Sequence, residues 1–188
     1  MARPKSNDKR RAILDAATRV IVAQGLSAPT ATIAREAGIS TGSLFTYFET
    51  KTDLLNQLYL ELKGEMTAAA LADFPEKAAL RKQAAHVWSG WMKWAAAHPD
   101  KRRALAVLGV ADEITPQTRA ATQKLIARPA ALIEQLRGKG RLSDAPMSFV
   151  GPIITSLAET TMDVMISDPA RAEEHCTAGF ETFWRVLA

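Results

Sequence analysis

Residues 38–51 hold the side chains with the most definite chemical use. At helical spacing, Leu44 and Phe48 lie four residues apart and share one face, which we expect to be buried. The opposite face carries hydroxyls and aromatic rings and no charge, although a solvated helix face normally carries Glu and Lys. Hydroxyls can bond base edges and apolar carbons can touch a thymine methyl group, so this face is predicted to read DNA. Its members are Thr41, Ser43, Thr46 and Tyr47, flanked by Phe45.

The sugar-phosphate backbone would be served by other residues nearby. Lys51, Tyr47 and Thr30 offer a cation and hydroxyls to phosphate oxygens, contacts that set register rather than sequence. Gly42 has no side chain, so the helix backbone at this position can come close to another surface such as DNA. The alternative interpretation of the whole pattern is a small helical core with an idle polar surface.

Short helices must position this face. Residues 29–37 predict a helix stopped by Gly38, and Ser40 can cap a second helix over residues 40–48. Two such helices joined by a glycine-containing turn match a helix-turn-helix. A longer helix at about residues 8–24 completes the unit, with Gly25 as the left-handed residue past its end. Thr50, with Asp53 three residues later, predicts the capped start of the next helix.

The excess positive charge is concentrated in the same part of the sequence. The chain has 24 Lys and Arg against 20 Asp and Glu, a net charge of +4. Residues 1–52 contain eight basic and four acidic side chains, so they account for all of the excess, and residues 53–188 are neutral. A polyanion is therefore expected to bind the first segment only.

Residues 8–55 resemble the DNA-binding domain of the TetR/AcrR family of transcriptional regulators. The resemblance is carried by Ile13-Leu14-Asp15-Ala16-Ala17, Gln24-Gly25, Thr32-Ile33-Ala34-Arg35-Glu36-Ala37-Gly38-Ile39-Ser40, Gly42-Ser43-Leu44-Phe45-Thr46-Tyr47-Phe48, and Lys51 with Leu54. It implies roles at particular positions. Thr41, Gly42, Ser43 and Thr46 match base-facing positions, whereas Thr30, Tyr47 and Lys51 match positions that contact the DNA backbone.

Two positions depart from the family pattern. Phe45 stands where many members have Tyr, and Ala31 stands where some members have a long basic residue. Shape readout and the N-terminal residues are therefore expected to carry more of the specificity. Arg3 and Lys5 are predicted to contact DNA as part of an N-terminal arm that enters a minor groove. The alternative is that they belong to a disordered tail that only keeps the protein soluble.

Helical periodicity runs through nearly the whole chain, and no stretch alternates with period two. Pro129 and Pro152 fall inside helical patterns and are expected to kink or split them. We expect an all-α protein of nine helices with a TetR-like architecture, in which residues 1–50 bind DNA and residues 51–188 bind ligand and dimerise. The nine helices are predicted at about residues 8–24, 29–37, 40–48, 50–71, 76–97, 100–110, 116–137, 146–166 and 169–187.

A cluster of large apolar residues in the second part predicts an effector pocket. Three of the four tryptophans fall within residues 88–94, and their spacing by three spreads them over part of the helix surface. Large apolar cavities with few polar groups are typical ligand sites, although each residue taken alone also fits a plain core. His86 is a weaker candidate for orienting a ligand. The pocket residues are predicted to be Tyr59, Leu62, Met66, Trp88, Trp91, Met92 and Val107.

The last two helices are predicted to form a homodimer across a two-fold axis. Each carries an apolar stripe, which in the alternative faces the core of its own chain. The dimer residues are predicted to be Val150, Ile154, Leu157, Thr161, Phe180, Phe183 and Trp184.

Several other classes of protein are excluded. The one cysteine, Cys176, cannot form an internal disulfide and is expected to be a buried hydrophobe rather than a redox switch. The three histidines have no metal-ligand spacing and no nucleophile accompanies them, so we expect no metal, no cofactor and no enzyme. No apolar run is expected to span a membrane, which predicts a cytoplasmic protein.

The predicted function is a DNA-binding transcriptional regulator that responds to a ligand. By its resemblance it is a repressor that binds a pseudo-palindromic double-stranded DNA operator as a homodimer and is released by a small apolar or amphipathic effector. The alternative is a DNA-binding regulator or architectural protein without small-molecule control.

Overall fold

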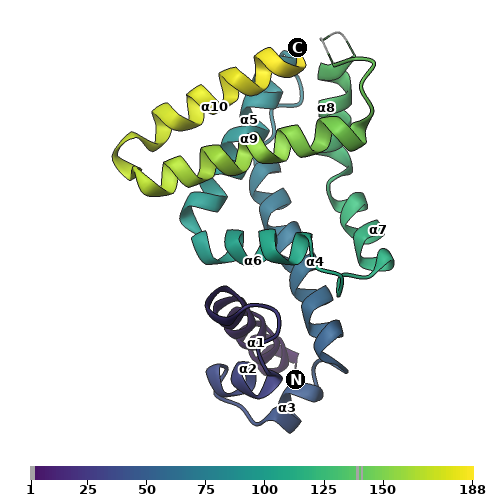
Figure 1. Cartoon of the computed structure of the whole chain (residues 1–188), viewed down its shortest axis with the longest axis vertical. Helices are drawn as coiled ribbons and strands as arrows, with labels where there is room; N and C mark the ends of the chain where they lie inside the picture. The colour runs from purple at the N-terminus through teal and green to yellow at the C-terminus, as the bar shows by residue number, and fades with distance from the viewer. Residues whose placement is uncertain (1–2, 139, 141) are drawn as a thin grey trace. The chain divides into compact units, whose positions relative to one another are not determined.

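The structure is a computed structural model that describes residues 3–138, 140 and 142–188, with side chains from Asn7 onward. Within these residues it contains ten α-helices, one 3-10 helix and no strand (Figure 1). The predicted all-α class is confirmed. The chain divides into two compact units, one of residues up to Gly64 with Asp100–Thr122 and one of Glu65–Pro99 with Gln123–Ala188. These units differ from the predicted domains 1–50 and 51–188, which remain a prediction about function.

The first unit contains the predicted helix-turn-helix. It is built from α1 (Arg3–Gln24), α2 (Thr30–Glu36), α3 (Thr41–Phe45), the start of α4 (Lys51–Leu71), α6 (Pro99–Gly109) and most of α7 (Pro116–Leu125). In its core α1 packs against α2 and α2 against α3. The side chains buried there include Ile13, Leu14, Ala17, Val20, Ile21, Ile33, Ala34, Leu44, Phe48 and Leu54.

The predicted glycines end α1 and α2 through their backbone conformation and hydrogen bonds. Gly25 and Gly38 have φ values of 79° and 68°. After α2 the N–H of Gly38 bonds the carbonyl of Arg35 at 3.1 Å, and the N–H of Ile39 bonds that of Ala34 at 3.0 Å. This pair of bonds is a Schellman ending, and it turns the chain sharply into α3. A side chain with a Cβ would strain the positive φ at Gly38.

Other helix boundaries differ from the prediction. α3 ends at Phe45 rather than at residue 48, and α5 (Leu80–Ala97) begins four residues later than expected. The expected helix over 116–137 is two helices, α7 and α8 (Ala127–Arg137), and the expected helix over 169–187 is a 3-10 turn (Pro169–Arg171) followed by α10 (Ala172–Leu187). Pro129 lies in the first turn of α8, where its missing N–H needs no partner.

The second unit is a bundle of α5, α8, α9 (Met147–Ser167) and α10, with the end of α4. α9 and α10 run side by side, and both pack against α5 (Figure 1). Gly179 allows a close approach there, because a Cβ at this position would lie 2.7 Å from Thr161 Cγ2 and 3.0 Å from Trp88 Cζ2. The core includes Trp88, Met92, Val150, Ile154, Ala158, Met162, Met165, Cys176, Phe180, Phe183 and Leu187.

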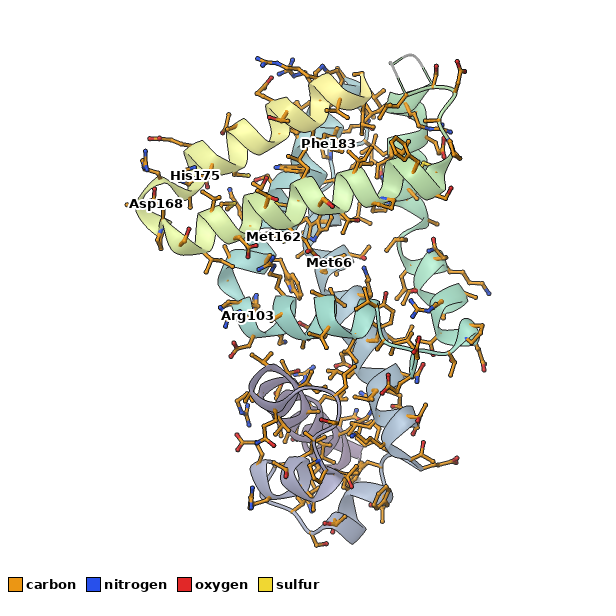
Figure 2. The ribbon with its side chains drawn as sticks, viewed as in Figure 1. Met66, Arg103, Met162, Asp168, His175 and Phe183 are labelled. Atoms are coloured by element: carbon orange, nitrogen blue, oxygen red, sulfur yellow. The ribbon has the colours of Figure 1, made fainter. Side chains whose placement is uncertain are left out.

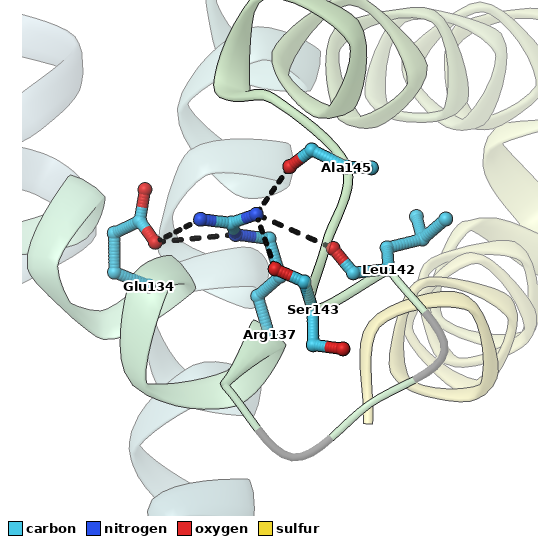
Figure 3. A network of polar contacts seen from close by, with 5 residues as sticks. All are labelled: Glu134, Arg137, Leu142, Ser143 and Ala145. Atoms are coloured by element: carbon cyan, nitrogen blue, oxygen red, sulfur yellow. Dashed lines mark hydrogen bonds and ion pairs between the residues drawn. The ribbon is translucent and has the colours of Figure 1, made fainter.

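Arg137 at the end of α8 holds the connection to α9. Its guanidinium donates to the carbonyl oxygens of Leu142 at 3.3 Å and Ser143 at 2.9 Å, and to that of Ala145 (Figure 3). Glu134 accepts from the other side of the guanidinium at 2.7 Å and 3.1 Å. One side chain therefore bonds three carbonyl groups of the segment that leads into α9.

Among the described helices, α9 alone is long and apolar enough to cross a membrane by length and composition. Glu159 and Asp163 interrupt the apolar sequence of α9, so the expectation that no apolar run spans a membrane stays a prediction. The apolar residues of α9 have another use, since Val150 and Ile154 are buried in the second unit and this helix packs on α10 and α5. Pro152 lies within α9 without ending it.

Candidate nucleic-acid interface

The surface of α3 has the predicted two-sided character. Leu44 and Phe48 are buried, whereas Gly42, Ser43 and Phe45 are exposed. Thr46 is also exposed, and Thr41 and Tyr47 are partly exposed. None of the residues 37–48 carries a charge. The outer face therefore offers hydroxyls and one apolar ring on a helix held in place by its buried side.

Hydrogen bonds within the segment hold several of these hydroxyls. Ser40 caps α3 by accepting from the N–H of Ser43 at 3.1 Å, and the two serine hydroxyls lie 2.9 Å apart. Thr46 Oγ1 donates to the Ser43 carbonyl at 2.7 Å. These bonds cap the short helix and hold the side chains of Ser40, Ser43 and Thr46 in fixed orientations.

The predicted phosphate-contacting residues lie at helix starts. Thr30 is the first residue of α2 and Lys51 the first of α4, and both are partly exposed. Thr50 Oγ1 accepts from the N–H of Asp53 at 2.9 Å, and Asp53 Oδ2 accepts from the N–H of Glu49 at 3.1 Å. The predicted cap by Thr50 is present, and Asp53 completes a variant of the capping box in which its carboxylate bonds the N–H of Glu49, the residue before the cap.

The N-terminal basic residues divide into two groups. Arg3 and Lys5 belong to α1 by backbone, but their side chains lie outside the described residues, so their DNA contact remains a prediction. Lys9 and Arg11 are exposed. Arg10 instead turns inward to α4.

Three groups hold the Arg10 guanidinium in the first unit. It donates to Gln57 Oε1 at 2.9 Å and 3.3 Å and pairs with Glu61 at 3.0 Å. It also lies 5.8 Å from the centroid of the Phe48 ring. Arg10 therefore connects α1 to α4 next to the buried ring of Phe48. Its position in a run of basic residues does not indicate this structural role.

Replacing Arg10 with alanine should lower the free energy of unfolding by about 1 kcal/mol, because a partly exposed charged hydrogen-bond network is lost. Urea denaturation followed by circular dichroism measures this change. Arg11→Ala, an equal charge loss at the next, exposed position, should stay within roughly 0.5 kcal/mol of the parent. Equal effects of the two substitutions would refute the structural role of Arg10.

A buried amide in the first unit was not predicted from the sequence. Asn56 on α4 is 7% exposed. Its Nδ2 donates to the carbonyls of Thr52 at 2.7 Å and Glu113 at 2.8 Å, and its Oδ1 accepts from the N–H of Thr115 at 2.9 Å. Arg119 donates to the carbonyls of Gly109 and Ala111 at 3.0 Å and 2.9 Å. Asn56 therefore binds the loop between α6 and α7 to the start of α4, and Arg119 binds the same loop to α7.

Comparison with known proteins accounts for this architecture. Residues 13–58 match the family of bacterial regulatory proteins named tetR. A structure described as a tetR family transcription regulator, from Shewanella sp. PV-4, is 30% identical, covers 94% of this chain and 96% of its own, and has a TM-score of 0.82. The chain belongs to the TetR family. Its N-terminal helix-turn-helix is therefore the DNA-binding element of a transcription regulator.

Two further proteins are similar to this chain, one in part of its sequence and one in its fold. A fatty acid metabolism regulator protein of Bacillus subtilis is 35% identical over 78 residues, which span 41% of this chain and 40% of that relative. The structure of the transcriptional regulator FadR from Bacillus subtilis, in complex with stearoyl-CoA, covers 90% of this chain and 97% of its own. It is 19% identical with a TM-score of 0.65, so it shares the fold.

The predicted effector residues of this TetR-family chain fall in both units. Tyr59, Leu62 and Val107 belong to the first unit, and Met66, Trp88, Trp91 and Met92 to the second. The pocket that they were predicted to form remains a prediction.

Their individual environments differ. Trp88 is buried, its ring centroid is 5.1 Å from that of Phe183, and its Nε1 donates to the Cys176 carbonyl at 3.1 Å. Trp88 is thus part of the core of the second unit, as is Met92. Val107 is exposed and Trp91 partly so. Tyr59 is buried, and this desolvation raises the pKa of its hydroxyl.

The predicted dimer residues mostly serve the core of the second unit. Val150, Ile154 and Thr161 on α9 are buried there, as are Phe180 and Phe183 on α10. Leu157 and Trp184 are partly exposed. α9 retains exposed apolar side chains elsewhere, with Phe149 at 55% and Val164 at 38% exposure. A dimer through α9 and α10 remains a prediction, and Phe149 and Val164 are exposed apolar side chains that it could bury beside Leu157 and Trp184.

The histidines of the TetR-family chain have structural partners. His86 lies 2.7 Å from the Ala72 carbonyl, and His98 bonds the Trp94 carbonyl at 3.0 Å. Asp168 and His175 lie near each other at the turn between α9 and α10 (Figure 2). Asp168 Oδ2 accepts from His175 at 3.0 Å and from Arg171 at 2.8 Å. The bond from His175 and then that from Arg171 lower the pKa of Asp168. No cluster suited to a metal ion occurs within the part of the chain that the structure describes.

Cys176 is buried in the second unit. Desolvation, followed by the negative charge of Glu173, raises the pKa of its thiol. The thiolate is the reactive form of cysteine, so this environment disfavours reaction at neutral pH. The residue fits the predicted role of a small buried hydrophobe.

Proposed function

We propose that this TetR-family regulator is a repressor that binds a pseudo-palindromic operator as a homodimer and releases it when a small apolar or amphipathic effector binds. The observation that carries the proposal is the uncharged hydroxyl and aromatic face of α3, held outward by buried Leu44 and Phe48 within the segment that holds the net positive charge. Two copies fit the need of helix-turn-helix proteins for two half-sites, typically about 34–36 Å apart. DNA as partner places the protein in the cytoplasm, and nothing in the proposal requires catalysis.

The effector class is supported by the relatives and by the second unit. One relative is named for fatty acid metabolism, and a protein of the same fold was solved with stearoyl-CoA. The second unit is rich in tryptophan and methionine, whose side chains suit an acyl chain. A long-chain acyl thioester is therefore the first effector to test.

Helix α4 is the element proposed to connect effector and DNA. It runs unbroken from Lys51 to Leu71 and contributes residues to both units. Asn56 binds its start to the α6–α7 loop, and Gly90 packs closely on its end at Ala69 and Ala70. An effector changes DNA affinity only by binding one arrangement of this helix better than another, with a typical coupling of about 1–3 kcal/mol.

The test measures operator binding by gel shift and fluorescence anisotropy, after selection of a site from random duplexes. Tyr47→Ala and Lys51→Ala should each weaken binding about tenfold at physiological salt, because a phosphate contact is lost. Lys51→Ala should also reduce the salt slope by about one. Lys77→Ala, at an exposed lysine of the second unit, is the matched control and should bind as the parent does. Parent-like binding by both interface variants would overturn the assignment of these residues.

The effector arm of the test uses stearoyl-CoA, with free coenzyme A as its control. Stearoyl-CoA should raise the melting temperature and release the operator, whereas coenzyme A should do neither. Operator binding that responds to no acyl thioester, free fatty acid or apolar cation would favour the alternative of a regulator without small-molecule control.

A further inference from the structure

The C-terminal end of α3 exposes an apolar ring and a hydroxyl at consecutive positions, since Phe45 is the last residue of the helix and Thr46 its C-cap residue. Phe45 is 43% exposed, and Thr46, the next residue, is exposed as well. Leu44 beneath them is fully buried, which fixes the direction of the turn. An outward ring on a helix face without charge gives a partner molecule apolar surface to contact.

The hydroxyl of Thr46 can only accept a hydrogen bond from a partner. Its single proton is donated to the Ser43 carbonyl at 2.7 Å, so only lone pairs point outward. In the major groove the available donors are the amino groups of adenine and cytosine, whereas guanine presents two acceptors. Thr46 is therefore suited to an amino group and repelled by guanine.

The ring of Phe45 has one apolar counterpart in the major groove, the methyl group of thymine. Side chains that form paired hydrogen bonds with purine bases do not occur on this helix. Residues 37–48 contain no Arg or Lys to pair with guanine and no Asn or Gln to pair with adenine. Selection by this helix therefore depends on methyl contact and on the acceptor at Thr46.

We infer that the end of α3 selects A·T base pairs in the major groove, with Phe45 on a thymine methyl group and Thr46 Oγ1 accepting from an adenine amino group. An A·T pair is the one natural pair that supplies both groups, since a G·C pair offers the amino group without the methyl. The inference rests on the proposed operator binding and adds the class of base that the operator must present.

The experiment uses the full chain and the duplex that it selects from a random library. Each thymine of a half-site is replaced in turn by uracil, which removes the methyl group and leaves base pairing intact. At one thymine, the parent should bind the uracil duplex about fourfold more weakly, as expected for one buried methyl group. Phe45→Ala should bind the thymine and uracil duplexes equally.

Two further measurements separate the possible outcomes. Thr46→Val, which keeps the side-chain shape and removes the acceptor, should reduce the preference for adenine over guanine at one position about fivefold. Lys51→Ala should weaken binding to thymine and uracil duplexes alike, which preserves their ratio.

Equal binding of thymine and uracil duplexes by the parent, or a thymine preference that persists in Phe45→Ala, would overturn the inference while leaving operator binding intact. Failure to select any duplex over bulk DNA would instead overturn the proposed function, and the inference with it.

Discussion

Replacing Asn56 with leucine should lower the free energy of unfolding by roughly 3 kcal/mol, because it leaves several buried polar groups without a partner. The amide bonds the Glu113 carbonyl at 2.8 Å and the Thr115 N–H at 2.9 Å, two loop groups that leucine cannot satisfy. Leucine branches at Cγ as asparagine does and is larger, so the change removes hydrogen bonds and creates no cavity. Urea denaturation of the full chain measures the loss.

Asn56→Asp is the sharper version of the same test. A carboxylate can still accept from Thr115, but its second oxygen would face the carbonyl oxygens of Thr52 and Glu113 where the amide donated. The variant should therefore be unstable at neutral pH and recover part of its stability in acid, when the carboxyl gains a proton that it can donate. Thr52→Ala, at an exposed position of the same helix, is the control and should change stability by less than about 0.5 kcal/mol. Stability of Asn56→Leu equal to that of the parent would show that the amide does not hold the loop.

Replacing Gly90 with alanine should destabilise the protein by about 2 kcal/mol, although alanine favours a helix by about 1 kcal/mol. A Cβ at this position would lie 2.7 Å from the Ala69 carbonyl oxygen and 2.8 Å from the Ala70 Cα. Both are backbone atoms of α4, so the overlap is relieved only when α4 and α5 move apart. The melting temperature of the full chain, followed by circular dichroism, measures the effect.

The matched control makes the same substitution where space is open. Gly64 lies within α4, and a Cβ there would meet nothing within 4 Å. Gly64→Ala should therefore stabilise the protein by about 0.5–1 kcal/mol through helix propensity. Opposite signs for the two glycines are the expected result. A stabilising Gly90→Ala would mean that α4 and α5 do not approach this closely.

The DNA-binding element was predictable because its signals are local. Gly38 ends α2, Ser40 caps α3, and Thr50 with Asp53 caps α4, and each of these contacts spans only a few residues. The hydrogen bonds that form them depend on residue type and backbone geometry, which the sequence specifies directly. Helical periodicity in the same way predicts which side of α3 is buried and which side faces outward.

Contacts between distant residues were not predictable in this manner. Arg10 looked like one of several basic residues near the N-terminus, yet it bonds Gln57 and Glu61 about fifty positions away. Asn56 carries no pattern that names the Glu113 and Thr115 loop as its partner. A single sequence does not state which polar side chain meets which backbone group after folding.

The apolar stripes on α9 and α10 show the same difference between what local sequence predicts and what only the folded structure decides. Their periodicity predicted apolar stripes that include Val150, Ile154 and Phe183, which are buried in the second unit, but periodicity cannot say whether a face is covered by the same chain or by a second copy. Helix type, caps and the charge distribution follow from residues near in sequence, because their energies are local. Which helix covers which apolar face depends on the packing of the whole bundle, and here α5 meets both stripes within one chain.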